Sequence, residues 1–337
     1  MKRTELPVLF IHDLDHTWDV REQERMFEKS NRMAKALESL GHPVIFLTIQ
    51  DANLEQVLSP YSPDEHIVFN FCEDLPGIPH SAYLVARILE KLGFTFTGSP
   101  SKVLYVDQDK HKVKKRLDKA GVPTPEWKMY SRACASDWKC FPAIVKPPLE
   151  HGSVGLDRES IVTDRESLEK RIQKILTEFQ QPALVEDFIN GREFRVSLLE
   201  DEGVRVLPIT EIDYSYFDDV FEKSLFLESK TNPDSIYFQQ TPVILPADLP
   251  PALKREIEVV SLAAYHCLGC RDYAGIDLRE RDGKVYVLDI NPDPEITPDC
   301  SFVQVARLAG YSYSELGSQM VNLAARRHPK FRAKALE

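Results

Sequence analysis

Two apolar stretches near the C-terminus of this 337-residue chain each carry one acidic residue, and this pattern restricts the fold most. Tyr273–Arg279 and Lys284–Ile290 are typical of β-strands joined by a turn, with Asp277 and Asp289 between aliphatic neighbours. An unpaired carboxylate costs several kcal/mol to bury. We therefore expect either a compensating cation beside both acids or a sheet edge at which they face water.

A divalent metal ion is one candidate for that cation. Asn291 follows Asp289 by two residues, so the two side chains project from the same face of the strand. Carboxylate and amide oxygens are hard ligands suited to magnesium or manganese. A two-residue loop would place Asp277 and Asp289 on opposite faces, whereas a three-residue loop, 281–283, with Gly283 in the left-handed conformation places them on one face. We predict the three-residue loop.

Composition excludes several classes of protein. The chain is 43% hydrophobic and 28% charged, which is ordinary for a soluble globular protein. A formal net charge of −11 argues against a nucleic-acid binder. The first apolar run is too short for a signal peptide, and no run reaches membrane-spanning length. We expect a cytoplasmic, multi-domain α/β protein that binds neither nucleic acid nor membrane.

The first hundred residues alternate between apolar strands and amphipathic helices. Alternation of this kind predicts a doubly wound parallel sheet with binding sites at the carboxyl ends of its strands. Asn70, Cys72 and Glu73 follow one such strand, so they are either pocket residues or plain loop residues. The expected strands are Leu6–Ile11, Pro43–Thr48, Glu65–Phe71 and Phe94–Thr97, and the expected helices are Arg21–Leu40 and Ile78–Leu92.

The middle of the chain carries features suited to phosphate binding. Lys146 is the last residue of a strand before two prolines, and the small-residue loop Glu150–Leu156 follows it. Such a loop exposes backbone N–H groups to phosphate oxygens, and a lysine beside it adds positive charge. The basic helix Asp107–Ala120 is expected to present a solvated charged face. Tyr214–Gln240 has no clear period and is predicted to be a long functional loop or lid.

In combination these features resemble the ATP-grasp superfamily, and within it the D-alanine–D-alanine ligases. The best stretches are TGSPSKVLYVDQDKHKVKKRLDKAGVPTPEW, IVKPPLEHGSVGL and GIDLRERDGKVYVLDINPDPEIT, and the resemblance extends from about residue 69 to residue 324. It implies an α/β ATP-grasp fold of three domains, with ATP held between the last two. We expect an N-terminal parallel-sheet domain at 1–109, a central ATP-grasp subdomain at 110–190, and a C-terminal domain with the metal and substrate sites at 191–337.

The resemblance also implies roles for individual residues. Asp277, Asp289 and Asn291 would bind two Mg²⁺ ions, with Mn²⁺ as the alternative metal. Lys230 and Ser153 would act in catalysis. The residues assigned to ATP are Lys110, Lys146, Gly152, Ser153, Val154, Gly155, Glu186, Asp187, Phe188, Glu193 and Lys230.

The reaction implied is ATP-driven ligation of a carboxylate to an amine through an acyl phosphate. The partners would be a small amino acid or other carboxylate and an amine. Ligases of this kind are often dimers, so a homodimer is one expectation.

The substrate half departs from the ligase pattern. Gly275 occupies the position of an arginine that stabilises the oxyanion, and Cys300, with Ser301 beside it, occupies the position of a serine that binds the acceptor. Glu295 replaces a turn glycine, and Glu24 lies near the expected first-substrate position without the family motif. We therefore expect a ligase of different substrate specificity. The alternatives are a genuine D-alanine–D-alanine ligase and a nucleotide-binding protein that has lost ligation.

Overall fold

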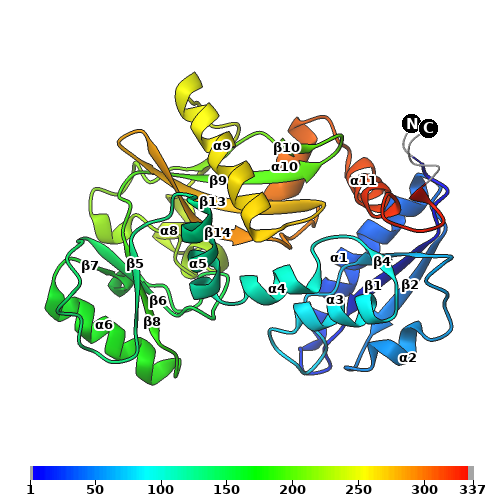
Figure 1. Cartoon of the computed structure of the whole chain (residues 1–337), viewed down its shortest axis with the longest axis horizontal. Coiled ribbons are helices and arrows are strands. Elements are labelled where there is room, and N and C mark those ends of the chain that lie inside the picture. Colours follow the sequence, from blue (N-terminus) through cyan, green and yellow to red (C-terminus); the bar gives the residue numbers. More distant parts are fainter. Residues whose placement is uncertain (1–2, 333–337) are drawn as a thin grey trace.

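The computed structural model describes residues 3–332, and its strands form three separate sheets (Figure 1). The first sheet is parallel, with the strand order β2-β1-β3-β4. Its strands are β1 (Val8–Asp13), β2 (Val44–Ile49), β3 (Ile67–Asn70) and β4 (Thr95–Phe96). The other two sheets are antiparallel. A parallel sheet combined with antiparallel sheets and helices confirms the predicted α/β fold class.

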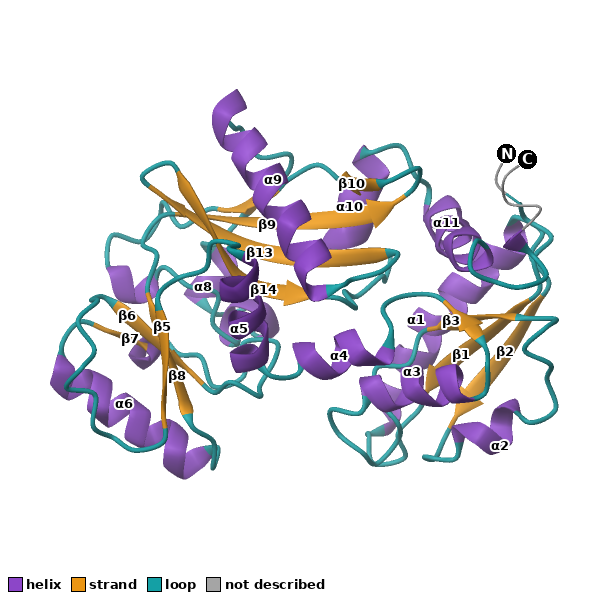
Figure 2. Cartoon of the chain, viewed as in Figure 1, coloured by secondary structure: helices purple, strands orange, loops and turns teal. Residues whose placement is uncertain are grey.

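Helices cover both faces of the parallel sheet (Figure 2). They are α1 (Val20–Ser39), α2 (Leu54–Leu58), α3 (Ala82–Lys91) and α4 (Ser101–Asp107). The last helix of the chain, α11 (Tyr313–Ala325), packs against α1 (Figure 1). The helices approach so closely that a Cβ at Gly317 would lie 2.6 Å from the sulfur of Met33. The two ends of the chain therefore share one hydrophobic core.

The second sheet has the strand order β5-β8-β6-β7. Its strands are β5 (Trp127–Tyr130), β6 (Ala143–Lys146), β7 (Ile161–Val162) and β8 (Ala183–Asp187). Helix α6 (Arg165–Glu178) packs on one face of it. Helix α5 (Lys110–Ala120) precedes this sheet, is capped by the Asp109 carboxylate and ends at Gly121. Gly121 has a positive φ of 68°, a conformation that glycine adopts without strain.

The third sheet has the order β12-β11-β9-β13-β14, with β10 also paired to β9. Helix α9 (Pro251–Leu268) covers one of its faces together with α5. The strands are β9 (Arg192–Glu200), β10 (Val204–Val206), β11 (Thr210–Ile212), β12 (Val243–Ile244), β13 (Tyr273–Arg281) and β14 (Lys284–Asn291). The predicted lid segment contains only the short helices α7 (Glu228–Thr231) and α8 (Ile236–Gln239) and one 3-10 turn. Helix α10 (Ser301–Leu308) follows β14.

The β13–β14 hairpin corrects one prediction. Arg281 pairs directly with Lys284, so the loop has two residues, Asp282 and Gly283, both with positive φ. The predicted three-residue loop is therefore wrong. A β-bulge compensates, because the register shifts between Asp277 and Leu278 and leaves an extra residue on β14. Asp277 consequently pairs with Asp289, and the two acids share one face, as a site for a common ligand requires.

The three sheets lie in the three predicted ranges, but α11 lies against the first sheet although its residues belong to the range 191–337. The predicted boundaries at 109/110 and 190/191 stay predictions, and the outermost residues of the two terminal ranges lie outside the described part of the chain. Within residues 3–332, no helix is both long and apolar enough to cross a membrane.

Candidate active site

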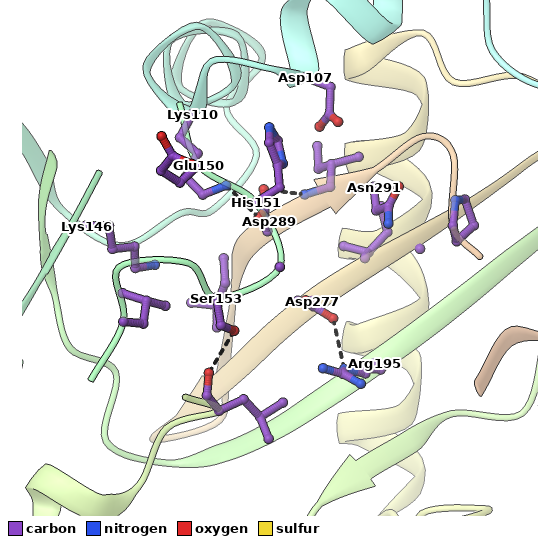
Figure 3. A pocket seen from close by; sticks show the side chains of 18 of the residues that line it. Asp107, Lys110, Lys146, Glu150, His151, Ser153, Arg195, Asp277, Asp289 and Asn291 are labelled. Carbon is purple, nitrogen blue, oxygen red and sulfur yellow. Dashed lines mark hydrogen bonds and ion pairs between the residues drawn. The ribbon is translucent and has the colours of Figure 1, made fainter. Parts of the chain in front are cut away.

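A cavity of about 670 Å³ lies where elements of all three sheets meet. This volume is typical of a small-molecule site. Figure 3 shows Lys110, Lys146, Ser153 and Asp277 turned toward this common space. The predicted site residues that line the cavity are Lys110, Lys146, Gly152, Ser153, Val154, Glu186, Asp187, Phe188, Glu193, Lys230, Asp277, Asp289, Asn291, Glu295, Cys300 and Ser301. Gly155 is not among the lining residues and packs against Phe179 and Pro147, and Glu24 is exposed on α1 and does not line the cavity either.

The small-residue loop after β6 has an unusual backbone. Gly152, Ser153 and Gly155 have φ values of 66°, 72° and 75°. A Cβ at Gly155 would lie 2.7 Å from the Phe179 ring and 2.8 Å from Pro147, so only glycine fits there. Left-handed residues in such a loop are tolerated where surrounding structure and function require them. A backbone of this kind allows a ligand to approach closely, as a phosphate cradle requires.

The lid segment is latched to this loop. The Ser153 hydroxyl donates a hydrogen bond of 2.8 Å to the carbonyl of Leu225, and the Lys230 ammonium donates one of 2.8 Å to the Ser153 oxygen. Loss of solvation lowers the pKa of Lys230, and the positive charge of Arg195 lowers it further. Ser153 and Lys230, which are distant in sequence, are thus brought together at the mouth of the cavity.

Glu186 lies at the centre of a buried charge triad. Its two carboxylate oxygens contact the ammonium groups of Lys114 at 2.9 Å and Lys146 at 2.7 Å. Burial acts to raise the pKa of Glu186, but the charges of Lys114 and Lys146 outweigh it and lower the pKa. Burial also lowers the pKa of Lys114. The triad fixes Lys146 at the end of β6, pointing into the cavity.

Lys114 was missed by sequence reasoning, which expected a solvated face for the whole basic helix. Lys114 is 1% exposed and lies on the buried face of α5 with Val113 and Leu117. That helical spacing was the available signal: a lysine beside apolar residues at i−1 and i+3 faces the same core.

A second buried ion pair lies beside the lid. Arg279 Nε donates a hydrogen bond of 2.8 Å to Glu193 Oε2, and Arg279 Nη2 lies 2.6 Å from the same oxygen. The Tyr214 hydroxyl donates to this oxygen at 3.1 Å. The guanidinium also lies 4.6 Å from the centre of the Phe188 ring. Arg279, which sequence reasoning did not select, therefore orients the Glu193 carboxylate and supports the neighbouring wall of the cavity.

The candidate metal ligands stand on paired strands. Asp277 and Asp289 are cross-strand partners, and Asn291 follows on the same strand. Lys110 Nζ lies 3.1 Å from Asp289 Oδ2. Burial acts to raise the pKa of Asp289, but the charges of Lys110, His151 and Lys146, with the hydrogen bond from Lys110, together outweigh it and lower the pKa. This carboxylate is therefore held in its ionised, ligand-competent form.

The donor set fits a magnesium ion that shares a nucleotide. Among residues 3–332, no group of three or more His, Cys, Asp and Glu side chains is arranged to hold a metal alone. Two carboxylates and one amide oxygen leave coordination positions that Mg²⁺ normally fills with water and phosphate oxygens. The phosphate side also fits: His151 Nε2, at the start of the loop, is buried without a hydrogen-bond partner in the described part of the chain.

The opposite end of the cavity is acidic. Glu295 forms an ion pair of 2.7 Å with Lys29 of α1, and the Cys300 thiol donates to the Glu295 carbonyl at 2.8 Å. Glu73, in the loop after β3, also lines the cavity, whereas Asn70 and Cys72, the other two strand-end candidates, are not among the lining residues. Burial raises the pKa of Asp293 to about 7; the hydrogen bond that the Tyr273 hydroxyl donates to it acts to lower this pKa, and the charge of Glu73 acts to raise it.

Comparison with known proteins identifies the family. Residues 117–322 match the sequence model of the family described as "D-ala D-ala ligase C-terminus". The chain belongs to this family. The ATP-grasp resemblance is thereby confirmed, and the chain is an ATP-dependent ligase of this family.

Individual relatives span nearly the whole chain. Protein y4sG of Sinorhizobium fredii (strain NBRC 101917 / NGR234), which is named as uncharacterized, is 32% identical over 89% of this chain and 88% of its own length. A D-alanine–D-alanine ligase of Desulforudis audaxviator (strain MP104C) is 29% identical over 91% of this chain and 95% of its own. The crystal structure of a D-alanine–D-alanine ligase from Bacillus anthracis complexed with ATP superposes with a TM-score of 0.71 at 24% identity. It covers 96% of this chain and 98% of that chain, and this likeness shows the fold.

Proposed function

We propose that the protein joins a small carboxylate to an amine in an ATP-dependent reaction that passes through an acyl phosphate. The observation that carries this proposal is the convergence on one cavity of three lysines, Lys110, Lys146 and Lys230, and the paired acids Asp277 and Asp289. The lysines suit a polyphosphate, and the acids suit the metal that accompanies it.

In this proposal the nucleotide lies along the middle of the cavity. Lys110 and Lys146 bind its phosphates, and the loop Gly152–Gly155 closes over the γ-phosphate with its backbone N–H groups. Glu193, held by Arg279, accepts hydrogen bonds from the ribose. The segment 186–188 contacts the adenine, although the Glu186 carboxylate itself is occupied by Lys114 and Lys146.

Asp277, Asp289 and Asn291 would hold two Mg²⁺ or Mn²⁺ ions. Bound divalent ions supply positive charge to the phosphoryl oxygens. The Asp289 carboxylate, kept ionised by Lys110, is ready to bind a cation.

The proposed reaction has two chemical steps, and the cavity side chains have a role in each. A substrate carboxylate oxygen attacks the γ-phosphorus of ATP, the bond to ADP breaks, and an acyl phosphate forms. An amine then attacks the acyl carbon, inorganic phosphate leaves, and the amine loses one proton as the amide forms. Lys230 and Ser153 stabilise charge on the transferring group, and the latched lid excludes water that would hydrolyse the acyl phosphate.

We further propose that the two substrates are not a pair of D-alanine molecules. The acceptor end is lined by Glu295, Cys300 and Ser301, and Gly275 contributes no side chain to it. A genuine D-alanine–D-alanine ligase remains the alternative, favoured by the relatives that carry that name. A cytoplasmic location and a homodimer stay predictions from the sequence.

Trapping of the acyl phosphate tests the proposed function without knowledge of the acceptor. Hydroxylamine replaces the amine, so each L- or D-amino acid that is activated gives a coloured hydroxamate in the presence of Mg²⁺ and ATP. We expect hydroxamate with at least one amino acid, followed by amide product when amino-acid pairs are analysed by mass spectrometry. ATP binding without any hydroxamate would instead support a protein that has lost ligation. Dominant formation of the D-alanine dimer would establish the alternative substrate assignment.

A further inference from the structure

The cations that line the cavity differ in how strongly they are engaged. Lys110 and Lys146 form ion pairs of 3.1 and 2.7 Å, Arg279 forms one of 2.6 Å, and Lys230 donates to Ser153 at 2.8 Å. Arg195 differs from all of these. Its closest ionic contact is Nε to Asp277 Oδ1 at 3.5 Å, and its guanidinium donates no hydrogen bond to any residue in the range 3–332.

Arg195 stands where the reaction would occur. It lies on the central strand β9 and pairs in register with Asp277 of β13, so both side chains leave the same face of the sheet. Figure 3 shows its guanidinium beside Asp277 at the edge of the cavity. Its charge also contributes to lowering the pKa of Lys230, after the effect of burial, so the two cations are neighbours.

A guanidinium that has no close ion-pair partner and faces a cavity is suited to binding a substrate carboxylate. Arginine presents several N–H donors in a fixed plane that matches two carboxylate oxygens, and it stays charged at any working pH. In the proposed reaction Lys230 and Ser153 contact the γ-phosphate, and Arg195 lines the same cavity close enough for its charge to act on Lys230, so a carboxylate that attacks the γ-phosphorus would lie near Arg195. Asp289 has Lys110 as its partner at 3.1 Å, whereas Asp277 contacts Arg195 at 3.5 Å, so within residues 3–332 Arg195 has no ionic partner at strong hydrogen-bond distance.

We propose that Arg195 is a catalytic residue that binds the acyl group of the carboxyl substrate. This inference rests on the ligase function proposed above. The guanidinium holds the carboxylate while one oxygen attacks the γ-phosphorus. The other oxygen becomes the carbonyl oxygen of the acyl phosphate, and it gains negative charge when the amine adds to the acyl carbon. Arg195 donates to that oxyanion until phosphate leaves and the carbonyl re-forms.

The neighbouring residue pair on β13 and β9 offers a second way to test a guanidinium role at this place. Gly275 pairs with Ser197, two residues along from the Asp277–Arg195 pair, and so lies on the same face. A Cβ at Gly275 would meet only ordinary contacts, at 3.8 Å from Pro294 and 3.9 Å from Asn291. A side chain can therefore begin at this position without a clash at its Cβ, and it would leave the sheet on the face that carries Arg195. Gly275 is also the position at which the ligase resemblance expects an arginine.

The first test compares Arg195→Met with Arg192→Met, a matched control on the same strand. Arg192 pairs with Glu211 and is not among the residues lining the cavity. With the amino acid that gives the most hydroxamate, we expect Arg195→Met to lower kcat/KM by about 10²–10³-fold, as loss of an oxyanion donor does. The KM for ATP and the Mg²⁺ concentration for half-maximal rate should stay near the wild-type values. Arg192→Met should retain nearly full activity.

Each remaining outcome decides the proposal. Arg195→Met activity equal to that of the control would overturn it, and so would a loss that excess Mg²⁺ restores, because Arg195 would then only position Asp277. If Arg195→Met does not fold, Arg195→Lys keeps the charge without the planar fork, and a partial loss supports the proposal. Recovery of at least tenfold in Arg195→Met/Gly275→Arg supports a guanidinium role at the acyl group. No hydroxamate from the wild-type protein would instead refute the ligase function itself.

Discussion

Replacing Lys114 by methionine is expected to destabilise the protein although this lysine is not among the residues that line the cavity. Lys114 is 1% exposed, and its ammonium lies 2.9 Å from one oxygen of the buried Glu186 carboxylate. At that separation the attraction is roughly 6 kcal/mol for an effective dielectric constant of about 20. Methionine keeps most of the side-chain volume, so the substitution removes charge without opening a large cavity.

The net effect is smaller than the attraction because Lys146 still faces the other Glu186 oxygen at 2.7 Å. Removing one partner from a buried charge network typically costs about 3–5 kcal/mol, so we expect a loss near the lower value, about 3 kcal/mol. Glu186 should then hold Lys146 more strongly. Since a hydrogen bond to a charged group contributes about 1.5–3 kcal/mol, weakening the contact of Lys146 with phosphate should raise the KM for ATP roughly tenfold.

The assay is urea unfolding together with ATP kinetics, and the control is Lys115→Met. Lys115 is the next residue on α5 and is exposed, so its replacement should change stability by no more than about 0.5 kcal/mol. The double variant Lys114→Met/Glu186→Gln should recover part of the lost stability, because the unpaired charge is removed as well. A Lys114→Met variant as stable as the Lys115→Met control would refute the buried-triad reasoning.

Three further predictions address the metal site, the lid and the pH dependence. Asp289→Asn should abolish metal-dependent hydroxamate formation while leaving the circular dichroism spectrum unchanged; near-wild-type rates would contradict the metal assignment. Lys230→Ala should lower kcat more than it raises the KM for ATP, because its contact strengthens as charge develops; the opposite split in steady-state kinetics would mean that it only binds ATP. Burial raises the pKa of Asp13 to about 7, so the native state binds this proton more tightly than the unfolded chain. The contribution of Asp13 to stability is therefore most favourable at low pH, falls as pH rises from about 4 to about 7, and changes no further above that range. Asp13→Asn should reduce the fall in thermal midpoint between about pH 5 and about pH 8, and an unchanged fall would exclude Asp13 as its cause.

Part of the active-site geometry could be predicted from local sequence. Lys146 precedes a run of small residues, and the strand period places Asn291 on the face of Asp289, because adjacent side chains alternate between faces. These relations involve residues only a few positions apart, and over that distance the periodicity of the backbone decides the direction in which each side chain points. The parallel first sheet followed from alternating apolar strands and helices for the same reason.

The β-bulge at Asp277 and Leu278 could not be predicted from such local relations. Asp277 and Asp289 must share a face of the sheet if they bind one ligand. A three-residue hairpin loop was the local feature that would place them so, and it was therefore predicted. The chain achieves it with a two-residue turn and a register shift five residues away from the loop. A bulge depends on how β13 also pairs with β9 on its other side, which is a tertiary contact.

The sequence by itself determined the family, the alternation of elements and the residue types of a nucleotide site, because these are carried by spacing along the chain. Only the tertiary structure decided which charges are partners. Lys114 and Glu186, Arg279 and Glu193, and Arg195 and Asp277 come from elements that are distant in sequence, and each pair forms because sheet register or helix packing brings the two groups within a few ångströms. Attraction between charges depends on distance and burial, and neither quantity exists before the chain has folded.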